Sequence, residues 1–562
     1  MRNPLNEQGT RVKKQKTAIK SAYDVIVVGS GIGGVATALT AAESGLSVAL
    51  FEKDRLLGGG TGWAHGGIWV GCNHIGLAAG YKDSRKAVLD YLRFVGGGAT
   101  EDDHVVAFAD NAPTAIRYFE RCGIKLQLTH GLPDHYYPVG PGATADGRSI
   151  EPRPISLDEL GEWKDLVRES QLDPPLLTIE EYVALGGSNN RQNWNHALIA
   201  EREKGNMRTR GAALIAHFVR ALLRRKVPIF NSTPITGLIR AGETVRGVRL
   251  ADGTAVRARL GVALATGGWE NDPDMTRNYE GLPGWSSMFP PSVNGDGLRL
   301  ASEAGAAVGL IRNNLALFLG FNVPTAREKE FRLSSIYELL CPHTILVNSK
   351  GERFADESYF QNVASALRRF DIWAREFSNL PCYLVFDSQY VRNFAFSGGE
   401  LGAIPPSWVQ RAPTLEKLAA KIGVPGRSLK KTVERFNGFA RKGVDEDFHR
   451  GEKAWTLAKR TQLKSGNRKN RTLGTLEEGP YYAVQMHPSA FASGGVRVST
   501  DAQVLNGRIE PISGLYAVGN VAAHTEYGVG YQAGYSLASG MTFGYLAVRH
   551  MKRAAARRKT AK

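Results

Sequence analysis

Near the start of the chain, a run of apolar residues typical of a strand is followed by apolar residues at helical spacing and then by a second strand-like run. Residues 25–28 (VIVV) are four consecutive β-branched side chains, which indicates a strand buried on both faces of a parallel sheet. Residues 35–44 carry apolar positions at helical spacing, and residues 47–52 (SVALFE) form a second strand-like run. This alternation of strand, helix and strand predicts an α/β fold with a doubly wound parallel core.

Two longer patterns follow in the middle of the chain. Residues 208–226 (RTRGAALIAHFVRALLRRK) have the spacing of an amphipathic helix. Residues 228–258 then read as short strands with a turn at ADGT, residues 251–254. We expect these strands to form a small additional β-layer beside the core.

Glycines occupy the turn between the first strand and the first helix. Gly29, Gly31 and Gly34 satisfy the pattern GxGxxG, in which the first makes a tight turn, the second lets the backbone approach a pyrophosphate, and the third allows close packing. Glu52 follows about 20 residues later, where an acidic side chain can accept hydrogen bonds from a ribose. The predicted dinucleotide-contacting residues are Gly29, Gly31, Gly33, Gly34, Glu52 and Lys53.

A second glycine-rich stretch, residues 56–74 (LLGGGTGWAHGGIWVGCNH), comes directly after the second strand. Such a segment can pass beside an isoalloxazine ring, where side chains would clash and backbone N–H groups can reach heteroatoms, so it favours FAD over NAD. Two later strand-like runs end at Gly267-Gly268 and Gly519-Asn520. The predicted flavin-contacting residues are Gly59, Gly60, Thr61, Gly66, Gly67, Gly267, Gly268, Gly519, Asn520, Ser536 and Leu537.

This order of motifs resembles the flavoproteins of the succinate dehydrogenase/fumarate reductase superfamily. The resemblance implies a discontinuous Rossmann-like FAD-binding domain with an inserted α+β substrate domain. The expected divisions are a basic tail at 1–20, the FAD domain at 21–286 and 488–550, the substrate domain at 287–487 and a basic tail at 551–562. Members that attach FAD covalently have a histidine before the residue corresponding to Thr61. Gly60 stands there in this chain, so we expect non-covalent FAD.

The dicarboxylate reductases of this superfamily bind their doubly charged substrates with arginines. Here Tyr531 and Gln361 stand at two of those arginine positions. A dicarboxylate would bury its charge poorly paired beside two neutral side chains. We therefore set a fumarate-reductase-like activity aside.

Four longer segments resemble the 3-ketosteroid dehydrogenases instead. They are residues 66–92, 135–154 (HYYPVGPGATADGRSIEPRP), 479–488 (GPYYAVQMHP) and 540–550 (GMTFGYLAVRH). The resemblance implies an FAD-dependent oxidoreductase that introduces a C=C bond next to the 3-keto group, with Δ1 desaturation favoured. The sequence YQAGYS at residues 531–536 is also similar to that of the Δ4-dehydrogenases, which remain the alternative.

The same resemblance implies roles for particular residues. Tyr531 O–H and the N–H groups around Gly534 would stabilise the enolate, with Tyr535 nearby. Tyr359 would remove the α-proton after a small shift in alignment, because an ungapped alignment puts Gln361 there, and Tyr136 would assist. If these tyrosines only line a pocket, the alternative is a flavin- or steroid-binding protein without turnover, for which Gln361 is the support.

Charge and cysteine content narrow the class of partner. The net charge is +17, but residues 1–22 and 549–562 carry +5 and +7 of it. This concentration in two tails, which we expect to be frayed, argues against nucleic-acid binding and favours solvated tails or weak attraction to an anionic membrane surface. The four cysteines show no metal-binding or disulfide spacing. We expect a cytoplasmic protein without a bound metal, with a 3-ketosteroid and an external electron acceptor, a quinone or similar, as its partners.

Overall fold

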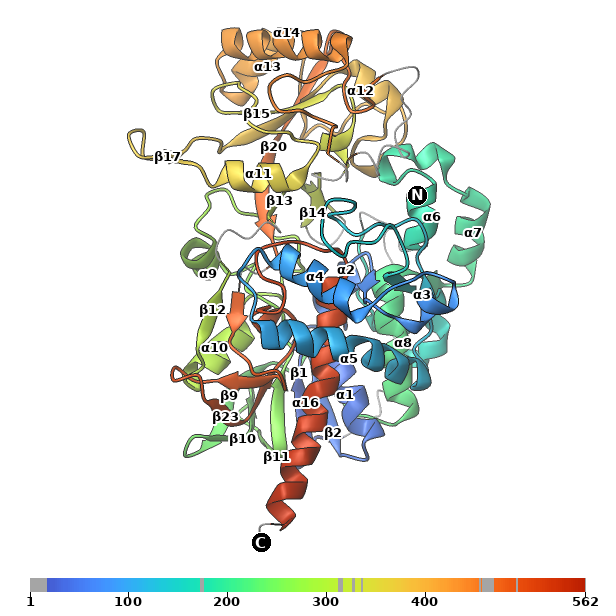
Figure 1. The fold of residues 1–562 in the computed structure, drawn as a ribbon, viewed down its shortest axis with the longest axis vertical. Coiled ribbons are helices and arrows are strands. Elements are labelled where there is room, and N and C mark those ends of the chain that lie inside the picture. Colours follow the sequence, from blue (N-terminus) through green and yellow to red (C-terminus); the bar gives the residue numbers. More distant parts are fainter. Residues whose placement is uncertain are drawn as a thin grey trace, which may run out of the picture.

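The computed structural model describes residues 18–171, 176–311, 317–325, 329–334, 337–453, 456, 469–491 and 494–560. The described chain forms two parts stacked along the long axis of the molecule (Figure 1). The lower part is built on a sheet that includes β1 and β2, and the upper part carries α11 to α14. The upper part is thus an insertion between the first and last segments of the lower part.

The lower sheet has the strand order β22-β23-β11-β1-β2-β8. Its strands are β1 (Ala22–Val28), β2 (Val48–Phe51), β8 (Ile229–Phe230), β11 (Ala255–Leu264), β22 (Gln503–Leu505) and β23 (Pro511–Ala517). β1 runs parallel to both β2 and β11, and β11 runs parallel to β23. The predicted doubly wound α/β core is confirmed, and β23 joins it from the far end of the chain.

Helix α1 (Ile32–Glu43) packs on both α8 (Arg210–Arg224) and α16 (Tyr535–Thr560) beside this sheet. The predicted helix is confirmed, and residues 210–222 of α8 are all buried, polar side chains included. Its polar residues have partners inside the protein, because Arg220 pairs with Glu159 and His217 hydrogen bonds to the carbonyl oxygen of Arg153.

The predicted turn at residues 251–254 lies between two antiparallel strands. β10 (Thr244–Leu250) pairs on one side with β11 and on the other with β9 (Ile235–Ala241). The small additional β-layer is therefore present at the edge of the lower part.

The upper part contains a mainly antiparallel sheet in the order β14-β13-β20-β18-β15, with β19 paired to β20. These strands are β13 (Leu317–Pro324), β14 (Lys329–Leu333), β15 (Thr344–Asn348), β18 (Cys382–Phe386), β19 (Gln410–Ala412) and β20 (Tyr481–Ala490). Its helices are α11 (Phe360–Leu367), α12 (Ser388–Asn393), α13 (Leu415–Ile422) and α14 (Gly426–Lys442). Strands and helices together make the inserted unit an α+β structure.

The packing places the boundaries between the two parts after the expected ones, 286/287 and 487/488. α10 (Asp296–Glu303) contributes Leu298, Leu300 and Ala301 to the lower core, although it follows residue 287. β20 continues past residue 487, since Pro488, Ser489 and Ala490 pair with β13. β12 (Val308–Leu310), which follows α10, pairs with β21 (Gly494–Val496) after β20. The chain therefore enters the upper part after β12 and leaves it after β20.

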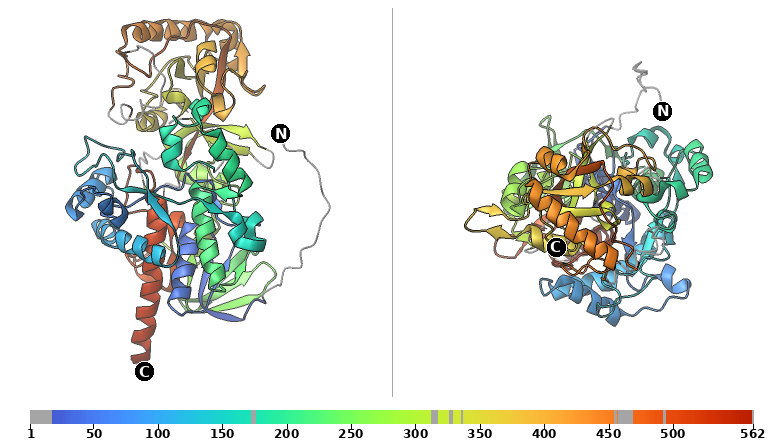
Figure 2. Two further views of the ribbon diagram at one scale, coloured as in Figure 1. Left: turned by 90° about the vertical axis from the view of Figure 1, so that its right-hand side faces the viewer. Right: turned by 90° about the horizontal axis from the view of Figure 1, so that it is seen from above.

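The C-terminal tail differs from expectation. α16 continues without a break to Thr560, and Met551 is buried, so the expected frayed segment is helical through residue 560. The alanines at 554–556 are strong helix formers and extend the helix beyond its packed turns. The far end of α16 projects from the lower part in Figure 1 and in the left view of Figure 2. The N-terminal tail, residues 1–17, lies outside the described residues.

Residues 157–171 and 176–206 form an excursion beside the join of the two parts, with α6 (Ile179–Ala184) and α7 (His196–Lys204) visible there in Figure 1. The remaining helices and strands used below or visible in the figures are α2 (Gly59–Trp63), α3 (His74–Ala78), α4 (Arg85–Gly96), α5 (Asp102–Arg121), α9 (Pro273–Met275), β3 (Ile68–Trp69), β4 (Leu126–Leu128), β5 (Ser149–Pro152), β6 (Ile155–Ser156), β7 (Met207–Arg208), β16 (Phe370–Asp371) and β17 (Glu376–Phe377). Over the part of the chain that the structure describes, no helix is both long and apolar enough to span a bilayer.

Candidate active site

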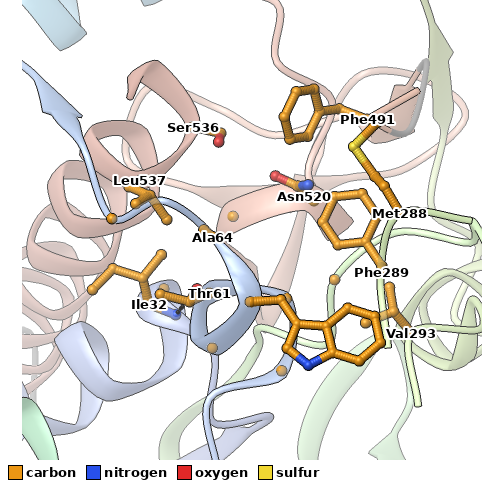
Figure 3. Close-up of a pocket in the computed structure, with 18 of the residues that line it drawn as sticks. Ile32, Thr61, Ala64, Met288, Phe289, Val293, Phe491, Asn520, Ser536 and Leu537 are labelled. Atoms are coloured by element: carbon orange, nitrogen blue, oxygen red, sulfur yellow. Dashed lines mark hydrogen bonds between the residues drawn. The ribbon is translucent and has the colours of Figure 1, made fainter. Parts of the chain in front are cut away.

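A cavity of about 430 Å³ lies where the two parts meet. Residues of the lower part, such as Ile32, Thr61 and Leu537, form one wall, and Met288 and Phe491 face them across the space (Figure 3). β13 and β14 of the upper part also line it, through residues such as Phe318 and Arg332. The cavity therefore needs both parts of the molecule.

The glycines of GxGxxG occupy the positions that the sequence predicts for them. Gly29 has φ +103°, and a Cβ there would lie 2.4 Å from the carbonyl oxygen of Ala265. A Cβ at Gly34 would lie 1.9 Å from the oxygen of Gly29, so close helix–strand packing requires glycine. Gly31 is different, because the nearest atom to its Cβ would be 3.8 Å away and the residue lines the cavity. The open space beside Gly31, at the N-terminus of α1, fits a pyrophosphate.

The acid at the end of β2 is held by the same turn. Glu52 Oε2 accepts hydrogen bonds from Ser30 N (2.9 Å) and Ser30 Oγ (2.6 Å). The next residue, Lys53, reaches Asp296 with an Nζ–Oδ2 distance of 2.5 Å. Glu52, Lys53 and Asp296 all line the cavity, so the ribose end of the predicted site is polar and fixed.

The glycine-rich loop at residues 59–67 lines the middle of the cavity. Ile32 N donates to Thr61 Oγ1 at 3.1 Å, which fastens this loop to the start of α1. A Cβ at Gly60 would lie 2.5 Å from the ring of Phe289, and one at Gly66 would lie 2.4 Å from the backbone of Arg210. A linking histidine at residue 60 would require Phe289 to move.

Most of the predicted cofactor-contacting residues meet at this cavity. Those that line it are Gly29, Gly31, Gly33, Glu52, Lys53, Gly59, Gly60, Thr61, Gly66, Gly67, Gly267, Gly519, Asn520, Ser536 and Leu537. Gly34 and Gly268 are not among the lining residues. Gly34 serves packing, as described above, and the oxygen of Gly268 accepts a hydrogen bond from Gly295 N at 2.9 Å.

Tyr531 stands at the end of the cavity away from GxGxxG, inside a cage of rings. Its ring makes edge-to-face contacts with Phe318 (5.1 Å between centroids) and Phe360 (5.5 Å), and it stacks on Phe491 (5.8 Å). Burial raises the pKa of Tyr531, so the hydroxyl keeps its proton and can donate a hydrogen bond. A neutral donor in apolar surroundings suits a neutral carbonyl better than a carboxylate.

Gly534 lies beside Tyr531, immediately before α16, with φ +86°. Its carbonyl oxygen accepts a hydrogen bond from Trp69 N at 3.1 Å, and a Cβ at this residue would lie 2.8 Å from the same nitrogen. Glycine is thus required for both the turn and the close approach. The first N–H groups of a helix have no partners within that helix, and Gly534 and Ser536 at this helix start line the cavity.

Tyr535 does not belong to this group, and here the expectation of a catalytic neighbour is not supported. Its ring packs on Phe108 and Tyr527, each 4.5 Å away between centroids, inside the lower core. It is absent from the residues that line the cavity. Successive residues of a helix point about 100° apart, so the one-residue step from Gly534 into α16 turns this side chain inward.

Tyr136 and Tyr359 adjoin the cavity end without lining it. Gln361 Nε2 donates to the hydroxyl oxygen of Tyr136 at 2.5 Å. Burial raises the pKa of Tyr136 to about 12, against the lowering effect of the N–H groups of Tyr531 and Gln361 at its oxygen. Burial and the nearby Tyr136 also raise the pKa of Tyr359. Gln361, expected only as an obstacle to catalysis, is thus a hydrogen-bond donor to one of the predicted tyrosines.

Sequence reasoning missed many residues of the cavity wall, among them His135 and Arg332. His135, directly before Tyr136, lines the cavity and packs edge-to-face on Tyr531 with ring centroids 4.9 Å apart. Arg332 on β14 lines the cavity as well, with its guanidinium group 4.7 Å from the ring centre of Tyr337 and 3.8 Å from Glu338. Arg332 belongs to no motif, whereas His135 begins the segment 135–154, in which the resemblance implies a role only for Tyr136.

A buried ionic cluster supports the segment before α11. Glu357 pairs with Arg353 (2.8 Å) and Arg450 (2.9 Å), and Arg353 also pairs with Asp445 (2.8 Å). The side chains of Glu357, Asp445 and Arg450 have no exposed surface. Because Tyr359 follows two residues after Glu357, this cluster fixes the start of α11 beside Tyr531.

Comparisons with known proteins agree with this site. The sequence model of the family described as FAD binding domain matches residues 24–540. A 4-oxocyclohexanecarboxylate 2-dehydrogenase from Sinomonas cyclohexanicum is 35% identical over 94% of this chain and 93% of its own. A 3-oxosteroid 1-dehydrogenase from Mycolicibacterium smegmatis is 34% identical over 93% of this chain and 96% of its own.

Among solved structures, a 3-ketosteroid Δ1-dehydrogenase from Sterolibacterium denitrificans, in complex with 1,4-androstadiene-3,17-dione, superimposes with a TM-score of 0.84. It is 30% identical, and the match covers 95% of this chain and all of that one. The chain therefore belongs to the FAD-binding flavoprotein family that includes the 3-oxosteroid 1-dehydrogenases. It is an FAD-dependent oxidoreductase, and the open space beside Gly31 and the glycine-rich loop fit that cofactor.

Proposed function

We propose that this protein desaturates a cyclic ketone between the carbons α and β to its carbonyl group, with a 3-ketosteroid as substrate and Δ1 as the favoured position. The observation that carries the proposal is the placement of Tyr531 and Gly534 at the substrate end of the FAD cavity. Both named relatives are dehydrogenases of ring ketones. In each name the numbered bond lies between the α and β carbons of the ketone.

The site's own residues supply stabilisation for the enolate. A proton α to a ketone is only weakly acidic until negative charge on the carbonyl oxygen is stabilised. Tyr531 O–H and the N–H groups at Gly534 would donate to that oxygen, and preorganised donors of this kind contribute roughly 3–4 kcal/mol each. The caged ring of Tyr531 holds the hydroxyl in place and keeps water away from it.

FAD, when bound, supplies the acceptor for the hydride from the β carbon. Residues on its side of the cavity would bind and orient it: the turn at Gly31 for the pyrophosphate, Glu52 for the ribose and the loop at residues 59–67 for the ring system. An external acceptor, a quinone or similar, would then take the electrons. The basic end of α16 would favour weak association with an anionic membrane, where such acceptors and steroids dissolve.

Two alternatives concern the substrate. Desaturation at C4–C5 of a saturated steroid ring would use the same donors and differ only in which carbons face the cofactor. A small ring ketone bearing a carboxylate is favoured by a different observation, the buried guanidinium group of Arg332 in the cavity wall. Arginine pairs well with carboxylates, although Glu338 at 3.8 Å already compensates part of its charge.

Anaerobic titration followed by product analysis tests the proposal. The oxidised protein is mixed with 4-androstene-3,17-dione, with a saturated 3-ketosteroid, or with 4-oxocyclohexanecarboxylate, and flavin bleaching is followed by absorbance. We expect the first to bleach the flavin and yield the 1,4-diene. Bleaching by the saturated steroid with desaturation at C4–C5 would favour the Δ4-dehydrogenase. Bleaching by 4-oxocyclohexanecarboxylate alone would favour a small ring ketone as substrate. Binding of these ketones without any bleaching would contradict the proposal and favour a binding protein.

A further inference from the structure

The proposed desaturation needs a group that takes the α-proton, and this group must reach the substrate beside Tyr531. The described cavity-lining residues with a proton-accepting side chain are Glu52, Lys53, His65, His135, Tyr182, Asp296, Glu330, Tyr337 and Tyr531. Tyr531 is assigned to the carbonyl oxygen, which leaves the other eight to be judged by position and by existing bonds.

Four of these eight groups are excluded as the base by their position and by the hydrogen bonds or ion pairs that they already make. Glu52 accepts from Ser30 at the cofactor end, and Lys53 pairs with Asp296. Glu330 accepts hydrogen bonds from Ser170 Oγ (3.0 Å) and Gln171 N (2.9 Å) of the excursion. These four groups serve either the predicted cofactor site or the contact between the excursion and β14.

His65, Tyr182 and Tyr337 form a separate cluster. Tyr337 Oη and His65 Nε2 are 3.0 Å apart, and the rings of His65 and Tyr182 meet edge-to-face at 5.8 Å. His135 instead packs directly on Tyr531, and its ring also meets Phe360 edge-to-face at 6.1 Å. Of the candidates, His135 is therefore the one with a ring contact to the carbonyl donor.

The loop that carries His135 is tied to the segment that carries Tyr531. His135 N donates to Gln532 Oε1 at 3.0 Å, and Tyr91 Oη donates to the same oxygen at 2.5 Å. Asp134, the preceding residue, is held by Trp69 Nε1 (2.7 Å) and by Arg148 (2.8 Å). The segments that carry the imidazole and the phenol are thus held together by bonds at residues 134 and 135.

The two tyrosines expected for proton transfer are less suited to it. Neither Tyr136 nor Tyr359 lines the cavity, and a phenol whose pKa is about 12, like that of Tyr136, is ionised in only about one molecule in 10⁵ at pH 7. A neutral imidazole can accept a proton directly at its unprotonated nitrogen, whereas a phenol must ionise first.

We infer that His135 is the general base of the proposed desaturation. An imidazole nitrogen takes the proton from the α carbon, and the C–H electron pair forms the enolate, whose oxygen is held by Tyr531. The enolate electrons then form the Cα=Cβ bond while the carbonyl is restored, and the β hydrogen leaves with its electron pair to FAD. The proton on His135 passes to solvent. The inference rests on the proposed function and assigns the proton transfer to a residue that the family resemblance does not single out.

The variants His135→Ala and His135→Gln test this assignment, the second keeping the size of the side chain. Flavin content and ketone binding are measured first, and then flavin reduction by 4-androstene-3,17-dione or 4-oxocyclohexanecarboxylate, whichever reduces the wild type, is followed by stopped flow. We expect stoichiometric flavin, an affinity within a few-fold, and a reduction rate about 100-fold or more below wild type in both variants. Tyr137→Phe, on an exposed side chain of the same loop, is the matched control and should reduce at the normal rate.

Chemical rescue separates a base from a merely structural residue. Added imidazole should restore reduction in His135→Ala in a saturable manner and should leave Tyr136→Phe and Tyr359→Phe unchanged. A reduction rate within a few-fold of wild type in both His135 variants would overturn the inference. So would slow variants that imidazole cannot rescue, or a larger loss in Tyr136→Phe, Tyr359→Phe or His65→Gln than in His135→Gln.

Proton exchange gives a readout that does not depend on hydride transfer. Pre-reduced wild-type protein in D₂O should exchange the α hydrogens of the ketone, as followed by NMR, and His135→Gln should not. Exchange at the wild-type rate in that variant would refute the base assignment while leaving the proposed function intact. If the wild type neither exchanges these hydrogens nor is reduced by any of the three ketones, the proposed function itself fails, and the assignment fails with it.

Discussion

The two ends of the cavity are built in different ways. At the cofactor end, the turn at Gly29 to Gly34 and the acid Glu52 come from one continuous strand–helix–strand unit. At the ketone end, Tyr531, His135 and Phe318 come from segments hundreds of residues apart. Local geometry therefore builds the proposed FAD site, whereas long-range packing between the two parts builds the proposed ketone site.

The largest expected effect is at the cofactor end. Gly31→Val should reduce bound FAD from stoichiometric to near zero, because a branched side chain would fill the open space beside the turn. The flavin content of the purified variant, read by absorbance, measures this, and far-ultraviolet circular dichroism checks folding. Gly507→Val is the control, since a Cβ at Gly507 meets no atom within 4 Å. Full flavin content in a folded Gly31→Val protein would show that the cofactor end has been misread.

The stability of the region around Tyr531 should depend instead on the ionic cluster of Glu357, Arg353, Arg450 and Asp445, which supports the segment before α11. Glu357→Gln leaves two buried guanidinium groups with one fewer charged partner, and breaking such a buried pair costs about 3–5 kcal/mol. Denaturant unfolding should show a loss of this size in the free energy of unfolding. Glu446→Gln removes an exposed pair with Lys442 and should change it by less than about 1 kcal/mol. Equal effects of the two variants would contradict a supporting role for the cluster.

Acid should weaken the lower part through His217 on α8. Burial lowers the pKa of His217 to about 4, below the value of about 6.5 in an unfolded chain. The unfolded state therefore binds more protons between these values. The contribution of His217 is complete above about pH 6.5 and is lost as the pH falls towards 4, by about 3 kcal/mol in all. Unfolding free energies measured from pH 7 to 4 should fall less steeply in His217→Gln than in wild type. An unchanged slope would contradict a contribution of His217 to acid sensitivity.

A further prediction is that FAD is not covalently attached to the chain. Acid precipitation should release all FAD into the supernatant, because Gly60 occupies the position of a linking histidine and faces the ring of Phe289. Absorbance of the washed pellet and the supernatant measures the division. Flavin retained by the denatured chain would mean a covalent link from a residue other than 60.

The cofactor end could be predicted from the sequence, whereas much of the ketone end could not. Val25 to Glu52 could be assigned residue by residue, because strand period, turn glycines and the following acid are all local signals. Tyr531 and Gly534, named from the resemblance, line the cavity, whereas Tyr535 does not, since one step into α16 turns its ring into the core. The contact of Gln361 with Tyr136 spans 225 residues, and no local pattern encodes such a contact.

The central claim is that Tyr531 holds the oxygen of a ring ketone during desaturation. Tyr531→Phe removes the hydroxyl and keeps the ring that packs with Phe318, Phe360 and Phe491. Stopped-flow reduction of the bound flavin under saturating ketone measures the consequence directly. The account predicts a rate about 100-fold or more below wild type with a much smaller change in ketone affinity. A rate within a few-fold of wild type, with only the affinity altered, would contradict it.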